Sequence, residues 1–343
     1  MNRVKEFFVK KNVVISGKRY FIDAMSAMAM GLFSSLLVGT ILNTIGGKLH
    51  LAFLTETLWP LCQQLTGAAI GIAIAHSLEA HTFVLYSATI VGYAGNFYGG
   101  PVGAYIATII STEIGKLISR ETKIDLIVTP MLTIISGVAL SVLVGPALSR
   151  FMNWLGFVIM RATELQPFWM GVTLSVIVGV ILTLPISSAA LCMMLSLGGL
   201  AGGAATVGCA AQMIGFAVMT YRDNGLGASF AVGIGTSMLH MPNIIRNPRI
   251  WIPPTLTAAI LGPLATMLFK LENVPIGSGM GTCGLVGQIG TITAMTNASK
   301  MNAGVYGAIL LLHFVLPALL TLAFTFALRK INWIKDGDLK LEI

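Results

Sequence analysis

Long apolar runs separated by short polar stretches dominate the pattern of hydrophobic and polar positions along this chain. A helix needs roughly 20 mostly apolar residues to cross the hydrocarbon core of a bilayer. Runs of this kind occur at 20–45, 58–78, 82–98, 126–148, 168–185, 255–271 and 302–328. A further helix restarts near Pro101. A stretch rich in small residues begins at Ser187 and leads to a span that ends near Thr220. The pattern predicts an all-α integral membrane protein with about ten membrane-crossing elements, including two re-entrant hairpins.

Two segments interrupt the apolar pattern, and we name them the first broken segment (residues 227–254) and the second broken segment (residues 272–299). The first carries four prolines, which remove backbone donors and stop helices: Pro242, Pro248, Pro253 and Pro254. The second is rich in glycine, which lets backbone approach backbone or ligand closely. Irregular backbone persists at membrane depth only where protein or a water-filled cavity satisfies it. In transport proteins such segments usually form the substrate site, so we expect one here.

Composition supports a membrane protein and excludes an ordinary soluble domain. Of the 343 residues, 55% are hydrophobic and 10% are charged, whereas soluble domains average about 25% charged residues. The mean hydropathy is +0.85. The four cysteines form no C-x-x-C pair and lie in apolar surroundings, so we expect packing residues rather than a metal site. Nothing in the pattern calls for a cofactor.

The net charge of +8 points to membrane topology rather than to a nucleic-acid partner. Lys and Arg collect in the cytoplasmic parts of membrane proteins. Ten of them flank the outermost spans: Arg3, Lys5, Lys10, Lys11, Lys18, Arg19, Arg329, Lys330, Lys335 and Lys340. We therefore expect both termini to lie in the cytoplasm, which requires an even number of crossings of the lipid bilayer.

Polar side chains within the breaks are the candidates for binding a small polar solute. They are Thr236, Ser237, His240, Asn243 and Asn247 in the first broken segment, Thr282 and Gln288 in the second, and Asn96 in a further glycine-rich break before Pro101. Structural roles are the alternatives. His240 would then supply a structural hydrogen bond within the hairpin. Asn243 and Asn247 would form turns beside prolines, and the glycines would permit close packing.

Ionisable residues within membrane spans are rare and often functional. Glu113 lies three residues before Lys116, so the spacing favours a local ion pair over a role in ion coupling. His313 lies in the last span, where we expect a packed, hydrogen-bonded histidine.

Motifs through both broken segments carry a family resemblance. They are Gly233, Gly235, Pro242, Asn247-Pro248, Ile252-Pro253, Met267-Leu268-Phe269, Val274-Pro275 and Gly277. In order and spacing they resemble the membrane component (IIC) of the fructose-type branch of the bacterial phosphoenolpyruvate-dependent sugar phosphotransferase system. The resemblance is closest to its stand-alone members, which include a toxin-regulator-like branch. It implies a homodimer with elevator-like movement, and separate IIA and IIB proteins as possible partners.

Two departures from the family pattern concern phosphoryl transfer. The family's loop glutamate falls on Met238, and the residue beside its histidine falls on Ile276. A carboxylate can polarise a sugar hydroxyl, whereas Met and Ile side chains cannot. This chain also lacks IIA and IIB domains, so we do not expect it to phosphorylate sugar alone, and we assign no catalytic residue.

These patterns predict five parts in the chain. They are a cytoplasmic basic segment (1–19), a scaffold and dimerisation half (20–186), a transport-like half with the hairpins (187–300), a last span (301–328) and a cytoplasmic tail (329–343). The leading interpretation is a permease of the bacterial cytoplasmic membrane that moves or binds a small, sugar-like solute. The alternative is a membrane sensor or regulator that binds its ligand without transport. A channel is a third reading, because glycine-rich re-entrant loops also line pores.

Overall fold

The computed structural model describes residues 3–341, and its regular elements are helices apart from one isolated antiparallel bridge between Gly199 and Asn273. The predicted end segments also include residues 1–2 and 342–343, which lie outside the described part. Within residues 3–341, six helices are long and apolar enough to cross a membrane: Arg19–Gly47, Phe53–Ser77, Asp125–Thr163, Gly199–Gly235, Pro248–Leu268 and Ala303–Lys330. The all-α membrane fold is thus confirmed, whereas the expected number of crossings stays a prediction.

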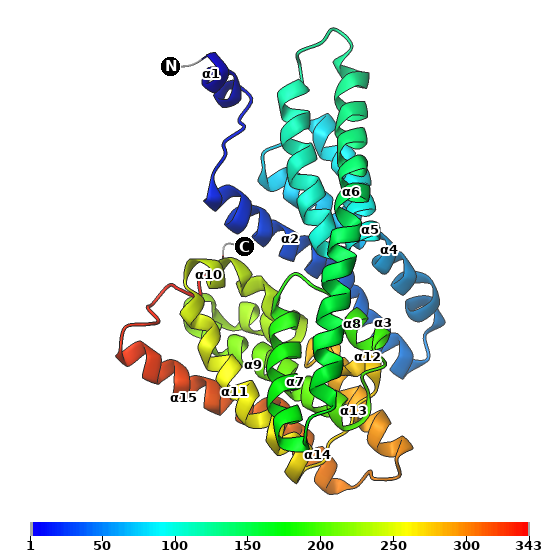
Figure 1. Ribbon diagram of the computed structural model, residues 1–343, viewed down its shortest axis with the longest axis vertical. Coiled ribbons are helices and arrows are strands. Elements are labelled where there is room, and N and C mark those ends of the chain that lie inside the picture. The colour runs from blue at the N-terminus through cyan, green and yellow to red at the C-terminus, as the bar shows by residue number, and fades with distance from the viewer. Residues whose placement is uncertain (1–2, 342–343) are drawn as a thin grey trace. The chain divides into compact units, whose positions relative to one another are not determined.

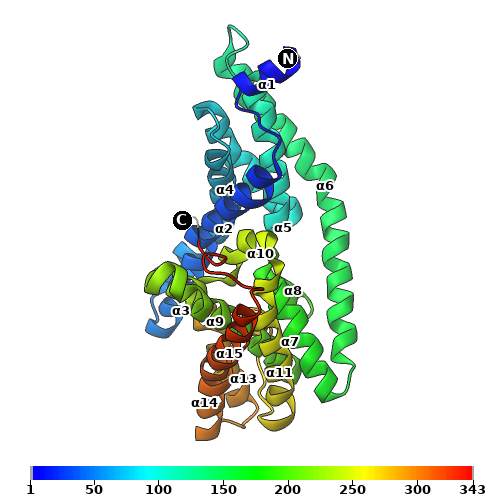
Figure 2. The same cartoon turned by 90° about the vertical axis from the view of Figure 1, so that its left-hand side faces the viewer.

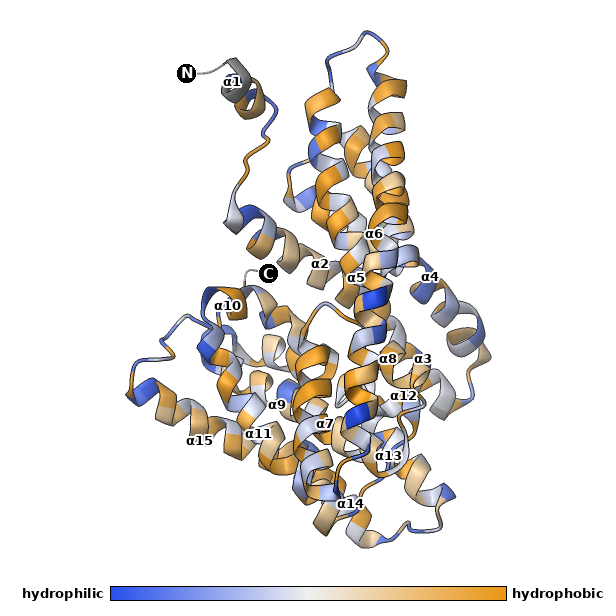
Figure 3. Ribbon diagram, viewed as in Figure 1, coloured by the Kyte–Doolittle hydropathy of each residue, from blue (hydrophilic) through white to orange (hydrophobic). Residues whose placement is uncertain are grey.

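Two compact units make up the chain, unit 1 (Met1–Phe151) and unit 2 (Met152–Ile343). This boundary follows packing, whereas the predicted boundary after residue 186 divides the chain by function and stays a prediction. In both units the helices are mostly apolar, and hydrophilic residues gather mainly in turns and at helix ends (Figure 3). This distribution suits helices whose sides face lipid and whose ends face water.

Unit 1 is built around α4 (Trp59–Ser77), which packs along α5 (Thr82–Ile118) and α2 (Ala24–Leu32). A Cβ atom at Gly71 would lie 2.1 Å from Ala88 O, so this helix approach requires glycine. The predicted break before Pro101 is confirmed, because Gly100 has φ 63° and ψ −163° inside α5. The other helices of unit 1 are α1 (Arg3–Lys10), α3 (Val38–Leu49) and the first part of α6 (Asp125–Thr163).

The predicted pair of Glu113 and Lys116 is also confirmed in unit 1. Glu113 Oε2 lies 3.1 Å from Lys116 Nζ, and Lys116 is 1% exposed. The ammonium group also donates to Asn12 O at 2.6 Å and Leu78 O at 2.9 Å. The N–H donors of Lys116 therefore hold chain segments together, in agreement with the predicted local ion pair.

Unit 2 is organised around α9 (Gly199–Phe230), which is mostly buried between Gly202 and Thr220. It packs against α7 (Pro167–Thr183), α11 (Ile252–Pro263) and α15 (Leu316–Lys330) (Figures 1 and 2). Its small side chains permit this. A Cβ atom at Gly208 would lie 1.9 Å from Ser175 O of α7, so the backbones meet directly. The other helices of unit 2 are α8 (Ser188–Met194), α10 (Met241–Arg246), α12 (Pro275–Ser278), α13 (Val286–Asn297) and α14 (Ala303–Leu310).

The first broken segment is a chain of short helical turns. After α9 come a π-helical turn, η4 (Ala231–Gly235), a 3-10 turn, η5 (Ser237–His240), then α10 and a second 3-10 turn, η6 (Pro248–Trp251). Pro242, Pro248 and Pro253 each occupy the first turn of one of these elements, where a missing N–H is tolerated. The prolines therefore set the breaks as the sequence predicted.

The second broken segment contains α12, the 3-10 turn η8 (Cys283–Leu285) and α13. Asn273 anchors its entry. The Asn273 Nδ2 atom lies 2.5 Å from Thr206 Oγ1, 2.9 Å from Gly287 O and 3.1 Å from Thr291 Oγ1. A Cβ atom at Gly290 would lie 2.3 Å from Asn273 Oδ1, so this glycine makes room for the amide. The segment is thereby fixed to α9.

Candidate functional site

The two broken segments meet inside unit 2. Thr282 is fully buried, and its hydroxyl donates a hydrogen bond to Gly233 O in η4. The turns η4 and η8 lie against each other at this bond. Because η4 is π-helical, its backbone departs from the regular hydrogen-bond pattern, a feature that often marks functional positions. The structure thus brings two of the predicted site regions together.

Ser237 joins a buried polar network next to the first broken segment. Its Oγ lies 2.8 Å from Thr183 Oγ1 on α7. The Oε1 atom of Gln212, on α9, accepts from Trp251 Nε1 at 3.0 Å, and its Nε2 donates to Thr255 Oγ1 at 3.1 Å. The sequence analysis did not single out Gln212, although an amide within a stretch of Ala and Gly was a usable signal. This network connects α7, α9, η5 and the start of α11.

His240 is fully buried in η5 and its ring stacks on Phe216, with ring centroids 5.1 Å apart. Its Nδ1 lies 3.5 Å from Asn243 Nδ2, and its Nε2 is buried without a hydrogen-bond partner. Burial lowers the pKa of His240 to about 3, because the charged ring would lose its hydration. The ring is therefore neutral at physiological pH.

Asn243 and Asn247 hold the C-terminal segment (residues 331–341). The Asn243 Nδ2 atom donates to Lys340 O at 3.1 Å. The Asn247 Nδ2 atom donates to Trp333 O at 3.0 Å and to Asp338 Oδ2 at 2.7 Å, while its Oδ1 accepts from Arg249 N at 3.2 Å. Both amides thus tie the first broken segment to the end of the chain, which runs beside α10 (Figures 1 and 2).

Thr236 caps η5, because its Oγ1 accepts from Met238 N at 3.1 Å. Met238 itself is 3% exposed, whereas Ile276 in α12 is 50% exposed. Neither position presents a polar atom, so the two departures from the family pattern stand in the folded chain. Asn96 belongs to unit 1, where it is half-buried and packs beside Gly67 of α4.

Gln288 and His313 form a second buried pair of amide and imidazole. Gln288 Nε2 lies 3.1 Å from His313 Nδ1. Gln288 is 6% exposed and His313 is fully buried. The Oε1 of Gln288 and the Nε2 of His313 are both buried without a hydrogen-bond partner. His313 lies in the π-helical turn η9 (Leu311–Val315) of the last span, and the sequence analysis expected it only as a packing residue.

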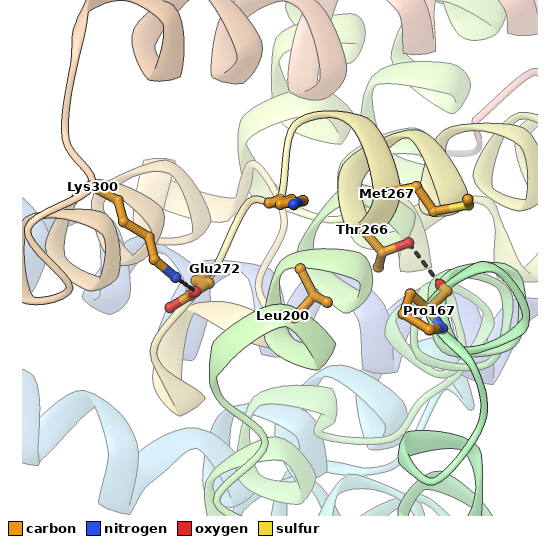
Figure 4. Close-up of a pocket in the computed structure, with 7 residues that line it drawn as sticks. Pro167, Leu200, Thr266, Met267, Glu272 and Lys300 are labelled. Atoms are coloured by element: carbon orange, nitrogen blue, oxygen red, sulfur yellow. Dashed lines mark hydrogen bonds and ion pairs between the residues drawn. The ribbon is translucent and has the colours of Figure 1, made fainter.

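A cavity of about 400 Å³ opens elsewhere in unit 2 and is lined by Pro167, Leu200, Thr266, Met267, Lys270, Glu272 and Lys300. Lys300 pairs with Glu272 across it, and Thr266 donates to Pro167 O at 2.7 Å (Figure 4). A neighbouring cavity of about 380 Å³ shares Lys270 and Lys300. Their linings contain none of the predicted site residues. Within the described part of the chain, no group of three or more His, Cys, Asp or Glu residues could hold a metal ion.

A comparison with known protein families covers most of the chain. The family model described as "Phosphotransferase system, EIIC" matches residues 22–341. Neither a curated protein nor a solved structure matches the chain.

Proposed function

The chain belongs to the EIIC family of the phosphotransferase system, the sugar-transporting membrane permease components, and we propose that it binds its sugar where the two broken segments of unit 2 meet. The hydrogen bond from Thr282 to Gly233 O carries this proposal. It joins two irregular backbone stretches that lipid could not satisfy, and each unsatisfied backbone group would cost several kcal/mol in a bilayer. The polar residues around the bond then supply contacts for a solute.

Thr282→Val tests this site, because valine keeps the shape of threonine and loses the donor. We expect sugar binding and uptake by the purified protein in proteoliposomes to fall about ten-fold, as a lost buried hydrogen bond is worth ~1.4 kcal/mol. Thr293→Val is the matched control, since Thr293 is exposed on α13 and bonds only within its own helix, to Ile289 O. Equal uptake by the two variants contradicts the proposed site.

Separate IIA and IIB proteins are the proposed source of any phosphoryl group. Met238 and Ile276 place no carboxylate or imidazole at the family's polar positions, so nothing there polarises a sugar hydroxyl. We expect no sugar phosphate from the purified chain with phosphoenolpyruvate and the general phosphotransferase components. Formation of sugar phosphate in that mixture, without an added IIB protein, overturns this assignment.

A sensor that binds sugar without carrying it is the second candidate function. The same departures at Met238 and Ile276 favour it, because a regulator needs recognition but no phosphoryl chemistry. Proteoliposomes separate the two functions. Saturable sugar binding together with counterflow of labelled sugar supports the permease, whereas binding without flux supports the sensor.

Both termini in the cytoplasm and a homodimer complete the proposal. Basic side chains cluster around the C-terminal segment, where Arg222 and Arg329 both pair with Asp336, as the rule for cytoplasmic segments expects. Reporter fusions at each end test the orientation. The molar mass of the purified protein, corrected for bound detergent, tests the dimer. A reporter active only outside the cell contradicts the orientation.

A further inference from the structure

We propose that His313 and Gln288 each bind one hydroxyl group of the same neutral sugar or polyol. The inference rests on the proposed function and names the chemistry that its site recognises. Both side chains are at least nine-tenths buried, and they contact each other through Gln288 Nε2 and His313 Nδ1 at 3.1 Å. Each still has one buried polar atom without a partner, Gln288 Oε1 and His313 Nε2.

The contact between the two side chains fixes what the pair offers to a ligand. If the amide nitrogen donates to His313 Nδ1, the ring carries its proton on Nε2. The free atoms are then one acceptor, Gln288 Oε1, and one donor, His313 Nε2–H. If the amide is turned over and accepts from Nδ1–H, the free groups are an amide N–H donor and an Nε2 acceptor. Either arrangement leaves one donor and one acceptor.

The two nitrogens of an imidazole ring point in different directions, so the two free atoms meet two separate groups. Hydroxyl groups suit both positions, since each donates one hydrogen bond and accepts others. An anion would need donors alone, and a metal ion would need acceptors alone. A protonated imidazole would be costly here, because His313 is fully buried and its near polar neighbour is a neutral amide. The site therefore suits a neutral ligand rich in hydroxyl groups.

The backbone around both residues is irregular in a way that suits a ligand site. His313 lies in the π-helical turn η9, which interrupts the last span. Gln288 lies in the first turn of α13, directly after Gly284 and Leu285, both in the left-handed conformation with φ 52° and φ 59°. A positive φ on leucine is strained and persists only where the surroundings enforce it. The same η8 turn contacts η4, so the pair belongs to the segment that makes the proposed site.

The test uses the full chain in lipid nanodiscs with D-glucose, D-fructose, D-mannitol and N-acetyl-D-glucosamine as probes. For each probe that binds, monodeoxy analogues remove one hydroxyl at a time. We expect two analogues to lose about ten-fold each in affinity on the wild-type protein, because each missing hydroxyl leaves one buried group unpaired. The other analogues should lose less.

Gln288→Met and His313→Phe then show which hydroxyl meets which side chain. Each variant keeps the volume and removes the hydrogen-bonding atoms, and either one suffices if the other misfolds in a melting curve. We expect each variant to bind the parent sugar as weakly as the wild type binds one of the two analogues, with no further loss when that same hydroxyl is removed.

Three other outcomes are informative. Variants that weaken every analogue alike, or none, overturn the inference and leave the pair with a structural role or a buried water only. A wild-type protein that binds a probe but discriminates no single hydroxyl also overturns it. A wild-type protein that neither binds nor transports any probe counts against the proposed function itself, and the inference falls with it.

Discussion

The two broken segments use the same kind of residue pair in different ways. In the first, His240 lies 3.5 Å from Asn243, and in the second, Gln288 lies 3.1 Å from His313. Asn243 is already used, because its Nδ2 donates to Lys340 O, and the His240 ring is covered by Phe216. Gln288 and His313 leave one atom each without a partner, whereas the first pair leaves one such atom, His240 Nε2. A buried pair of amide and imidazole therefore offers contacts to two hydroxyl groups only when both of its members keep a free atom.

The difference extends to what anchors each segment. The first is tied to the C-terminal segment through Asn243 and Asn247. The second is tied to α9 through Asn273, which lies among residues of the same membrane region. Loosening the first anchor should therefore free a surface segment, whereas loosening the second should unfold part of the core.

The largest expected effect is on the second anchor. Asn273→Leu removes an amide that lies within hydrogen-bond distance of Thr206, Gly287 and Thr291 and places a bulky side chain against two glycines. We expect a loss of about 3 kcal/mol or more in the free energy of unfolding, measured in mild detergent. The control is Asn297→Leu, at an exposed position on the same hairpin. Equal stability of the two variants would show that Asn273 is not an anchor.

Acid should reveal the buried histidine of the first segment. The pKa of His240 is lowered by burial to about 3, below its ordinary value near 6.5. Stability from the neutral ring is therefore complete above pH 6.5 and falls as the pH drops toward 3, because the unfolded chain takes up the proton first. Between pH 7 and pH 5 we expect a loss of about 2 kcal/mol. His240→Phe should reduce this loss, and an unchanged pH profile would contradict the assigned burial.

Exchanging each histidine for phenylalanine sharpens the contrast between the pairs. His313→Phe should change the melting temperature little, because it removes the buried, unpartnered Nε2 atom but also leaves Gln288 Nε2 without its partner, while sugar affinity falls. His240→Phe should keep sugar affinity within about two-fold, because its neighbour Asn243 is held by the C-terminal segment. The reverse pattern of affinities would assign the ligand to the first broken segment.

The smallest effect concerns the C-terminal segment. Asn247→Ala removes donors to Trp333 O and Asp338 and should cost about 1 kcal/mol. Amide hydrogen exchange across residues 333–340 should speed up, with sugar uptake unchanged. Lys335→Ala, at an exposed position of the C-terminal segment, is the control. Exchange that stays slow in Asn247→Ala would remove this residue from the anchor.

Local features of this fold follow from the sequence. Apolar runs gave the membrane helices, prolines such as Pro242 and Pro248 marked the breaks, and the spacing of Glu113 and Lys116 gave their ion pair. Each depends on neighbours within one or two helical turns, so the chain order itself contains the information.

Long-range pairings could not be predicted in the same way. Arg19 donates to Leu78 O, far along the chain. Asn243 meets Lys340, far along the chain, and Gln288 meets His313 across two helices. Hydrophobic periodicity shows which face of a helix is buried but not which partner covers it. The asparagines and His313 could therefore be recognised from the sequence as polar interruptions. Their hydrogen-bond partners could be identified only from the structure.

A structure of the protein with bound sugar in a lipid nanodisc tests the proposed site most directly. The expected result is sugar density at the meeting point of the two broken segments, with one hydroxyl within about 3 Å of Gln288 and another within about 3 Å of His313. The hydrogen bond from Thr282 to Gly233 O should be retained. Density away from this meeting point, for example against Asn96 in unit 1, would contradict it.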